Sequence, residues 1–155
     1  MPIDRLADML RLIRSPVIRR ASLVYARLAL GVGFLSAVAD RFGVWGPPGA
    51  TNVAWGDFAA FLRSTAKLNP YAPTAAVPLL AWTVTLCETV LGLALVVGFA
   101  TRVIAALSSL LLLAFALGMT IGTGIKSAFD ASVFAAAAAA LLLALDADDS
   151  RTEHK

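Results

Sequence analysis

The stretch VPLLAWTVTLCETVLGLALVVGF, residues 77–99, decides the fold because it is long and apolar enough to cross a membrane as a helix. Such a helix is about 34 Å long at 1.5 Å per residue, and the hydrocarbon core of a bilayer is about 30 Å thick. Glu88 stands near the middle of the stretch. A carboxylate at that depth is costly in lipid, so it predicts a helix bundle whose interior holds a partner for Glu88.

Three further apolar stretches predict membrane-spanning helices, at residues 21–42, 102–121 and 128–145. The composition agrees, since 59% of the 155 residues are hydrophobic and 15% are charged, whereas a soluble domain has about 45–50% and about 25%. The mean hydropathy is +0.81. The sequence therefore predicts an all-α integral membrane protein, a four-helix bundle that leaves no room for a second catalytic domain.

The long connection between the first two spans contains a predicted amphipathic helix at residues 55–68. Its apolar side chains recur at helical spacing and alternate with charged ones. They are Trp55, Phe58, Phe61, Leu62 and Leu68. Such a helix either lies flat at the membrane interface or forms a lid over the mouth of the bundle, and the sequence leaves both alternatives open.

Basic residues near the ends of the predicted spans set the orientation. Eight lie on the side of the two termini: Arg5, Arg11, Arg14, Arg19, Arg20, Arg102, Arg151 and Lys155. Four lie on the opposite side: Arg41, Arg63, Lys67 and Lys126. Because basic residues collect on the cytoplasmic side, we expect a bacterial cytoplasmic (inner) membrane protein with both termini cytoplasmic and the amphipathic helix periplasmic.

Two terminal segments flank the four-helix domain, residues 21–146. Residues 1–20 form a basic segment that we expect to lie on anionic lipid, without any role for nucleic acid, and residues 147–155 form a tail. The start of the chain also imitates a cleavable signal peptide that ends at Ala37-Val-Ala39. Arg27 within the apolar run argues against that alternative.

Arg27 is the predicted partner of Glu88, because the first two spans are antiparallel and the two residues differ in depth by about 6–8 Å. Thr85 lies one helical turn from Glu88 and belongs to the same candidate polar site. Three interpretations remain open. The pair locks two helices together, Arg27 alone extends to the cytoplasmic interface, or the site takes a ligand or a proton.

A second candidate polar cluster lies toward the outer face. It consists of Asp40, Arg41, Asn69, Tyr71, Lys126 and Asp130. Lys126 and Asp130 have the i, i+4 spacing of a helix-surface ion pair. These residues either stay solvated near the membrane boundary or line an outward-facing polar cup.

The inventory of reactive side chains is short. Cys87 is the only cysteine and His154 the only histidine, so the sequence predicts no metal site, no covalently bound cofactor and no thiol pair within this chain. A redox cofactor would then be diffusible or belong to a partner. Whether the chain is an enzyme is left open.

Several short stretches resemble the DoxX family of small four-helix membrane proteins. They begin with Arg27-Leu-Ala-Leu-Gly-Val-Gly-Phe-Leu, Ala39-Asp-Arg-Phe-Gly43 and Leu68-Asn-Pro-Tyr71. Others are Glu88-Thr-Val-Leu-Gly92, Gly98-Phe-Ala-Thr-Arg102, Gly124-Ile-Lys126 and Asp130-Ala-Ser-Val-Phe134. One departure is Arg41, which stands where similar proteins often have a lysine. The resemblance implies a four-helix membrane bundle. Some members of that family are associated with quinone-linked oxidation, and others are assembly factors.

The favoured function is a partner-dependent subunit of a membrane oxidoreductase system, with a quinone head group or a small sulfur substrate bound near Glu88 and Arg27. The alternative is a scaffold, chaperone or assembly factor without catalysis. A transporter is disfavoured because the sequence has no inverted repeat. We expect the lipid bilayer and a membrane or redox protein as partners, and the sequence also allows a homo-oligomer.

Overall fold

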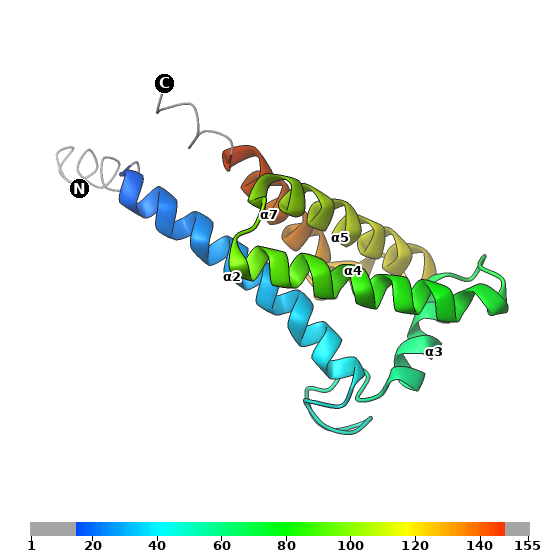
Figure 1. The fold of residues 1–155 in the computed structure, drawn as a ribbon. Helices are drawn as coiled ribbons and strands as arrows, with labels where there is room; N and C mark the ends of the chain where they lie inside the picture. Colours follow the sequence, from blue (N-terminus) through cyan, green and yellow to red (C-terminus); the bar gives the residue numbers. More distant parts are fainter. Residues whose placement is uncertain (1–14, 148–155) are drawn as a thin grey trace, which may run out of the picture.

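A computed structural model describes residues 15–147, and those residues are helical with connecting loops and turns and contain no strand (Figure 1). The elements in chain order are α2 (Pro16–Arg41), α3 (Phe58–Leu68), η1 (Thr74–Ala76), α4 (Val77–Val97), α5 (Thr101–Thr123), α6 (Ile125–Asp130) and α7 (Val133–Asp146). Most of the basic segment and of the tail lies outside the described residues. So do Arg5, Arg11, Arg14, Arg151, His154 and Lys155.

Three helices are long and apolar enough to cross a membrane: Pro16–Arg41, Thr74–Val97 and Thr101–Thr123. They coincide with the first three predicted spans, which confirms an all-helical fold with three candidate membrane-spanning helices. The first helix begins five residues earlier than predicted, at Pro16 rather than at residue 21. Ser15 caps this start by accepting a hydrogen bond from the Ile18 amide at 3.3 Å, and proline fits the first helical position.

The fourth predicted span, residues 128–145, is not one helix. The chain is helical in α6, breaks at Ala131 and Ser132, and resumes as α7, which has 14 residues. Ser132 has φ of 55°, a left-handed conformation that ends a right-handed helix. At 1.5 Å per residue α7 is about 21 Å long, shorter than the hydrocarbon core of about 30 Å. The alanine-rich composition of this stretch concealed the break.

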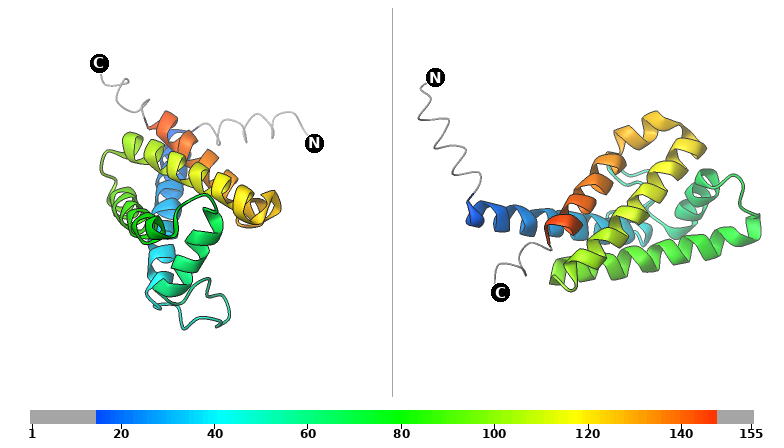
Figure 2. Two further views of the ribbon diagram at one scale, coloured as in Figure 1. Left: turned by 90° about the vertical axis from the view of Figure 1, so that its right-hand side faces the viewer. Right: turned by 90° about the horizontal axis from the view of Figure 1, so that it is seen from above.

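The helices pack as two close pairs, α2 against α4 and α5 against α7 (Figure 2). In the first pair the backbones touch at two glycines: a Cβ atom added to Gly31 would lie 2.9 Å from the Gly92 carbonyl oxygen. Small residues permit such close approach between membrane helices. In the second pair the Ser109 hydroxyl donates to the Ala137 carbonyl at 2.8 Å.

Many large apolar side chains on these helices are exposed, among them Leu79, Leu110, Leu142 and Val97. A soluble protein would bury such a surface, whereas lipid tails cover it in a membrane.

Helix α3 is the predicted amphipathic helix, and it lies across one end of α2, α4 and α5 (Figure 1). It begins at Phe58 because Asp57 caps it, accepting a hydrogen bond from the Ala60 amide at 2.6 Å. The Phe58 ring packs on Trp82 of α4 with centroids 4.4 Å apart. The helix thus covers this end of the structure.

Candidate functional site

A buried ion pair joins α2 to α4 beneath α3. The guanidinium of Arg41, the last residue of α2, contacts the carboxylate of Glu88 in the middle of α4. Both side chains are almost fully buried, at 2% and 4% exposure. The Nη1 group of Arg41 also donates to the Thr85 hydroxyl at 2.9 Å, and that hydroxyl donates to the Ala81 carbonyl at 2.8 Å. Thr85 and Glu88 therefore contact the same guanidinium.

Aromatic side chains cover the guanidinium on the α3 side. The Arg41 Cζ atom lies 3.8 Å from the centroid of the Phe61 ring and 5.2 Å from that of the Trp55 ring. An aromatic face attracts a cation, most strongly where water is excluded. Phe61 is itself buried at 6% exposure. The ion pair and its aromatic cover therefore hold α2, α3 and α4 together at one place.

Asp40 stands next to Arg41 and is 5% exposed. Its Oδ2 atom accepts hydrogen bonds from the backbone amides of Ala54 at 3.1 Å and Trp55 at 2.8 Å. Its Oδ1 atom is buried and accepts none from the described residues. Asp40 thereby fixes the loop that precedes α3, which places Trp55 beside Arg41.

The predicted partner of Glu88 was wrong: the carboxylate meets Arg41, and Arg27 lies elsewhere. Side chains on a helix slant toward its N-terminus. In the antiparallel pair α2 and α4, Arg27 and Glu88 therefore slant apart, whereas Arg41 and Glu88 slant toward each other. The Arg27 guanidinium occupies the space over Gly98, at the far end of α4.

The six residues of the predicted outer cluster do not form one site. Asp40 and Arg41 belong to the buried site, whereas Lys126 and Asp130 pair with each other at 2.5 Å on the exposed surface of α6, with exposures of 85% and 63%. The Asn69 amide donates to the Thr65 carbonyl of its own helix at 2.9 Å. Tyr71 is 87% exposed. Because exposed polar side chains such as Lys126, Asp130 and Tyr71 are hydrated, they do not have to cluster with one another to satisfy their polar groups.

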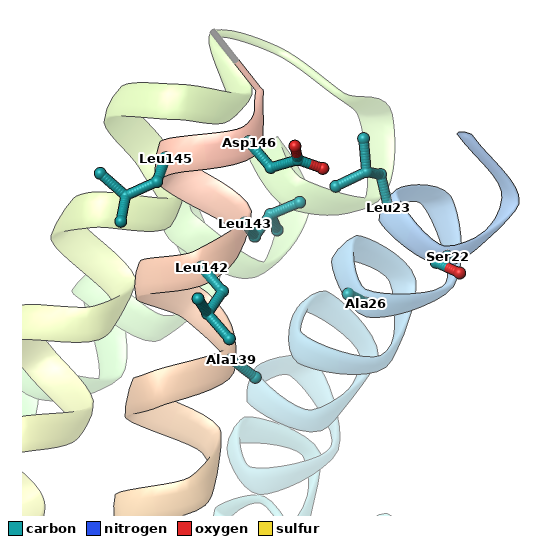
Figure 3. Close-up of a pocket in the computed structure, with 8 residues that line it drawn as sticks. All are labelled: Ser22, Leu23, Ala26, Ala139, Leu142, Leu143, Leu145 and Asp146. Carbon is teal, nitrogen blue, oxygen red and sulfur yellow. The ribbon is translucent and has the colours of Figure 1, made fainter. Parts of the chain in front are cut away.

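Two hollows lie on the surface of α2. A groove of about 590 Å³ between α2 and α7 is lined mainly by Leu23, Ala26, Leu142 and Leu143, and Asp146 stands at its end (Figure 3). There Asp146 accepts a hydrogen bond from Arg19 at 2.7 Å, which links the start of α2 to the end of α7. The second hollow, about 370 Å³, lies near the other end of α2 beside Asp40, Trp45 and Trp55.

Among residues 15–147, no group of three or more His, Cys, Asp or Glu side chains is arranged to hold a metal ion. Cys87 has no cysteine partner, since the sequence contains one cysteine. The polar and charged groups of the site are therefore the carboxylates of Asp40 and Glu88, the guanidinium of Arg41, the hydroxyl of Thr85 and the indole of Trp55.

Residues 18–132 match the model of a protein family described as methylamine utilisation protein MauE. No curated protein and no solved structure matches the chain. This family is a different one from DoxX, so the resemblance drawn from the sequence was wrong. The stretches that carried it combine glycines, leucines and single charges, and such combinations occur in many unrelated membrane proteins because glycines let helices pack closely and buried charges pair inside bundles.

Proposed function

The chain belongs to the MauE family of membrane proteins, and we propose that it serves methylamine utilisation as an accessory protein that works through a protein partner. The observation that carries the accessory role is that the buried Arg41–Glu88 ion pair is covered by other side chains. Glu88 is bound by Arg41, and Arg41 is covered by Phe61 and Trp55. Such a network stabilises one arrangement of α2, α3 and α4, which suits a protein that presents a fixed surface to a partner.

A quinone-linked reaction at Glu88 is the second candidate. The observation that favours it is a carboxylate buried within a membrane helix, which is often functional. A quinone there would have to displace the guanidinium of Arg41 or enter beside it. The accessory role requires no such displacement, and for that reason we favour it.

We further propose a topology of four membrane crossings in the bacterial cytoplasmic membrane, with both termini cytoplasmic and α3 periplasmic. The fourth crossing would be the broken unit α6 and α7, residues 125–146. Two observations support it: α7 packs along α5, and its end at Asp146 bonds to Arg19 at the start of α2.

Cysteine labelling tests the topology. In a Cys87→Ala background we expect Lys67→Cys and Lys126→Cys to react with an impermeant maleimide in intact cells. Phe99→Cys and Ala147→Cys should react only after the membrane is opened. Lys67, Phe99 and Ala147 lie outside the helices proposed to cross, and Lys126 is the second residue of α6, at the start of the fourth proposed crossing. Labelling of Ala147→Cys from outside would show that α7 does not cross.

Growth separates the two candidate functions. In the source organism, we expect loss of the gene to abolish growth on methylamine and to leave growth on a carbon source without an amine unchanged. The double variant Arg41→Met/Glu88→Gln removes both charges and leaves no unpaired one. If the pair is structural, this variant restores growth on methylamine; if Glu88 handles protons for a quinone, it does not.

The purified chain supplies the control. We expect it to show no methylamine oxidation alone and no saturable binding of a quinone analogue. Quinone binding that the double variant abolishes, in protein that remains folded, would replace the accessory role by the quinone-linked one. Normal growth of the deletion strain on methylamine would contradict both candidates.

A further inference from the structure

We propose that the hollow beside Asp40 binds a small organic ammonium ion, with Asp40 as its counter-charge and Trp45 and Trp55 as its aromatic walls. The hollow has a volume of about 370 Å³ and is also lined by Ser36 and Asn52. Nothing in the accessory role requires such a site. Only the choice of methylammonium as the probe rests on the proposed function.

The first argument is charge. Asp40, Arg41 and Glu88 together carry two carboxylates and one guanidinium, which leaves a formal charge of −1 in a buried place. The Nη1 and Nη2 groups of Arg41 are directed to Thr85 and Glu88. Buried charges are normally paired, so this cluster favours one additional cation.

The second argument is the unused oxygen of Asp40. The backbone amides of Ala54 and Trp55 bond to Oδ2, whereas Oδ1 accepts no hydrogen bond from the described residues. Buried polar atoms usually have partners, so an exception calls for one. Asp40 is among the residues that line the hollow, so an ammonium ion bound there would supply the missing partner.

The third argument is the pair of indoles, which selects the kind of cation. Trp45 donates its Nε1–H to the Ser36 carbonyl at 3.1 Å, and Trp55 donates its own to the Ser64 hydroxyl at 3.1 Å. These bonds hold both rings in place and occupy their only donors. Electron-rich rings attract organic cations, whereas Ca²⁺ or Mg²⁺ would need about six oxygen ligands. One carboxylate and two indoles therefore suit an alkylammonium ion.

The hollow is also reachable. Trp45 is 59% exposed, and Asn52 and Ala54 lie on the exposed surface of the same loop. The volume exceeds that of a single water molecule, about 30 Å³, by enough to hold a small alkylammonium ion with water around it. A ligand can thus enter from the α3 end without passing between the membrane helices.

Titration of the full chain in detergent with methylammonium chloride tests the proposal, by calorimetry and by tryptophan fluorescence against equal sodium chloride. We expect saturable binding that sodium does not reproduce. Asp40→Asn keeps the shape of the side chain and removes its charge, and it should weaken binding at least about tenfold, a change of about 1.4 kcal/mol. Asp130→Asn removes a carboxylate from the exposed surface and should leave the affinity unchanged.

Trp45→Leu is the second variant, chosen because this exposed residue can be changed without opening the core. We expect it to weaken binding about three- to tenfold. Absence of saturable binding, an equal response to sodium, or an unchanged affinity in Trp45→Leu or in folded Asp40→Asn would each overturn the proposal. Its failure is distinct from that of the accessory role, because growth on methylamine tests the latter without any binding measurement.

Discussion

Arg41→Met and Glu88→Gln should each lower the free energy of unfolding by about 3–5 kcal/mol, the usual cost of removing one partner of a buried ion pair. The cost arises because the remaining charge keeps its burial and loses its counter-charge. Both side chains are nearly inaccessible, at 2% and 4% exposure, so water cannot compensate. The double variant leaves no orphan charge and should recover a large part of the loss.

Reversible unfolding in mixed micelles, followed by circular dichroism, gives the three free energies of this cycle. Arg27→Met is the matched control, since it removes the same functional group from the same helix without touching Glu88. Lys126→Ala removes one partner of an exposed pair and should cost less than about 1 kcal/mol. Additive losses in the double variant would show that Arg41 and Glu88 are not coupled.

The sequence predicted the three long helices because their signals are local. An apolar run of about 20 residues needs no knowledge of its neighbours to be identified as a membrane helix. The amphipathic helix, predicted at residues 55–68 and found at Phe58–Leu68, also has a local signal, the helical spacing of its apolar residues. The break at Ser132 was missed, because one residue in a left-handed conformation does not change the hydrophobic pattern of an alanine-rich stretch.

The partner of Glu88 could not be read from depth alone. Depth placed Arg27 within reach, yet the slant of side chains on antiparallel helices selects Arg41. That rule was available from the sequence and would have favoured Arg41. Phe61 and Trp55 were expected only as parts of an apolar helix face, since their position over Arg41 depends on how the 42–57 loop folds back.

The packing of α3 on α5 is the other feature that could not be predicted from the sequence, because it depends on backbone contacts. Gly118 and Gly122 form a single GxxxG pattern near the end of α5, which by itself is a weak signal of helix packing. In the structure Gly122 lies directly beneath the end of α3. A Cβ atom added there would clash with the Lys67 carbonyl oxygen and lie 2.7 Å from Leu68 Cα. Both neighbours are backbone atoms, which cannot rotate away as a side chain can.

Gly122→Ala should therefore push α3 off α5 and lower the free energy of unfolding by about 1–3 kcal/mol, the typical cost of an overpacked contact. Gly118→Ala is the matched control, because the nearest atom to a Cβ there is the Leu68 carbonyl oxygen at 3.6 Å, an ordinary contact. Its stability should be unchanged or slightly higher, since alanine favours a helix.

Displacement of α3 should also loosen the cover over the buried pair, because Phe61 moves with the helix. A cysteine at Thr65, which is 6% exposed in α3, reports this movement in the Cys87→Ala background. We expect maleimide to label Thr65→Cys slowly in the protein that keeps both glycines and in the Gly118→Ala variant. In the Gly122→Ala variant the labelling should be much faster. Equal labelling in all three would show that α3 does not depend on its contact with Gly122, and the ion pair with its aromatic cover would then be what holds it.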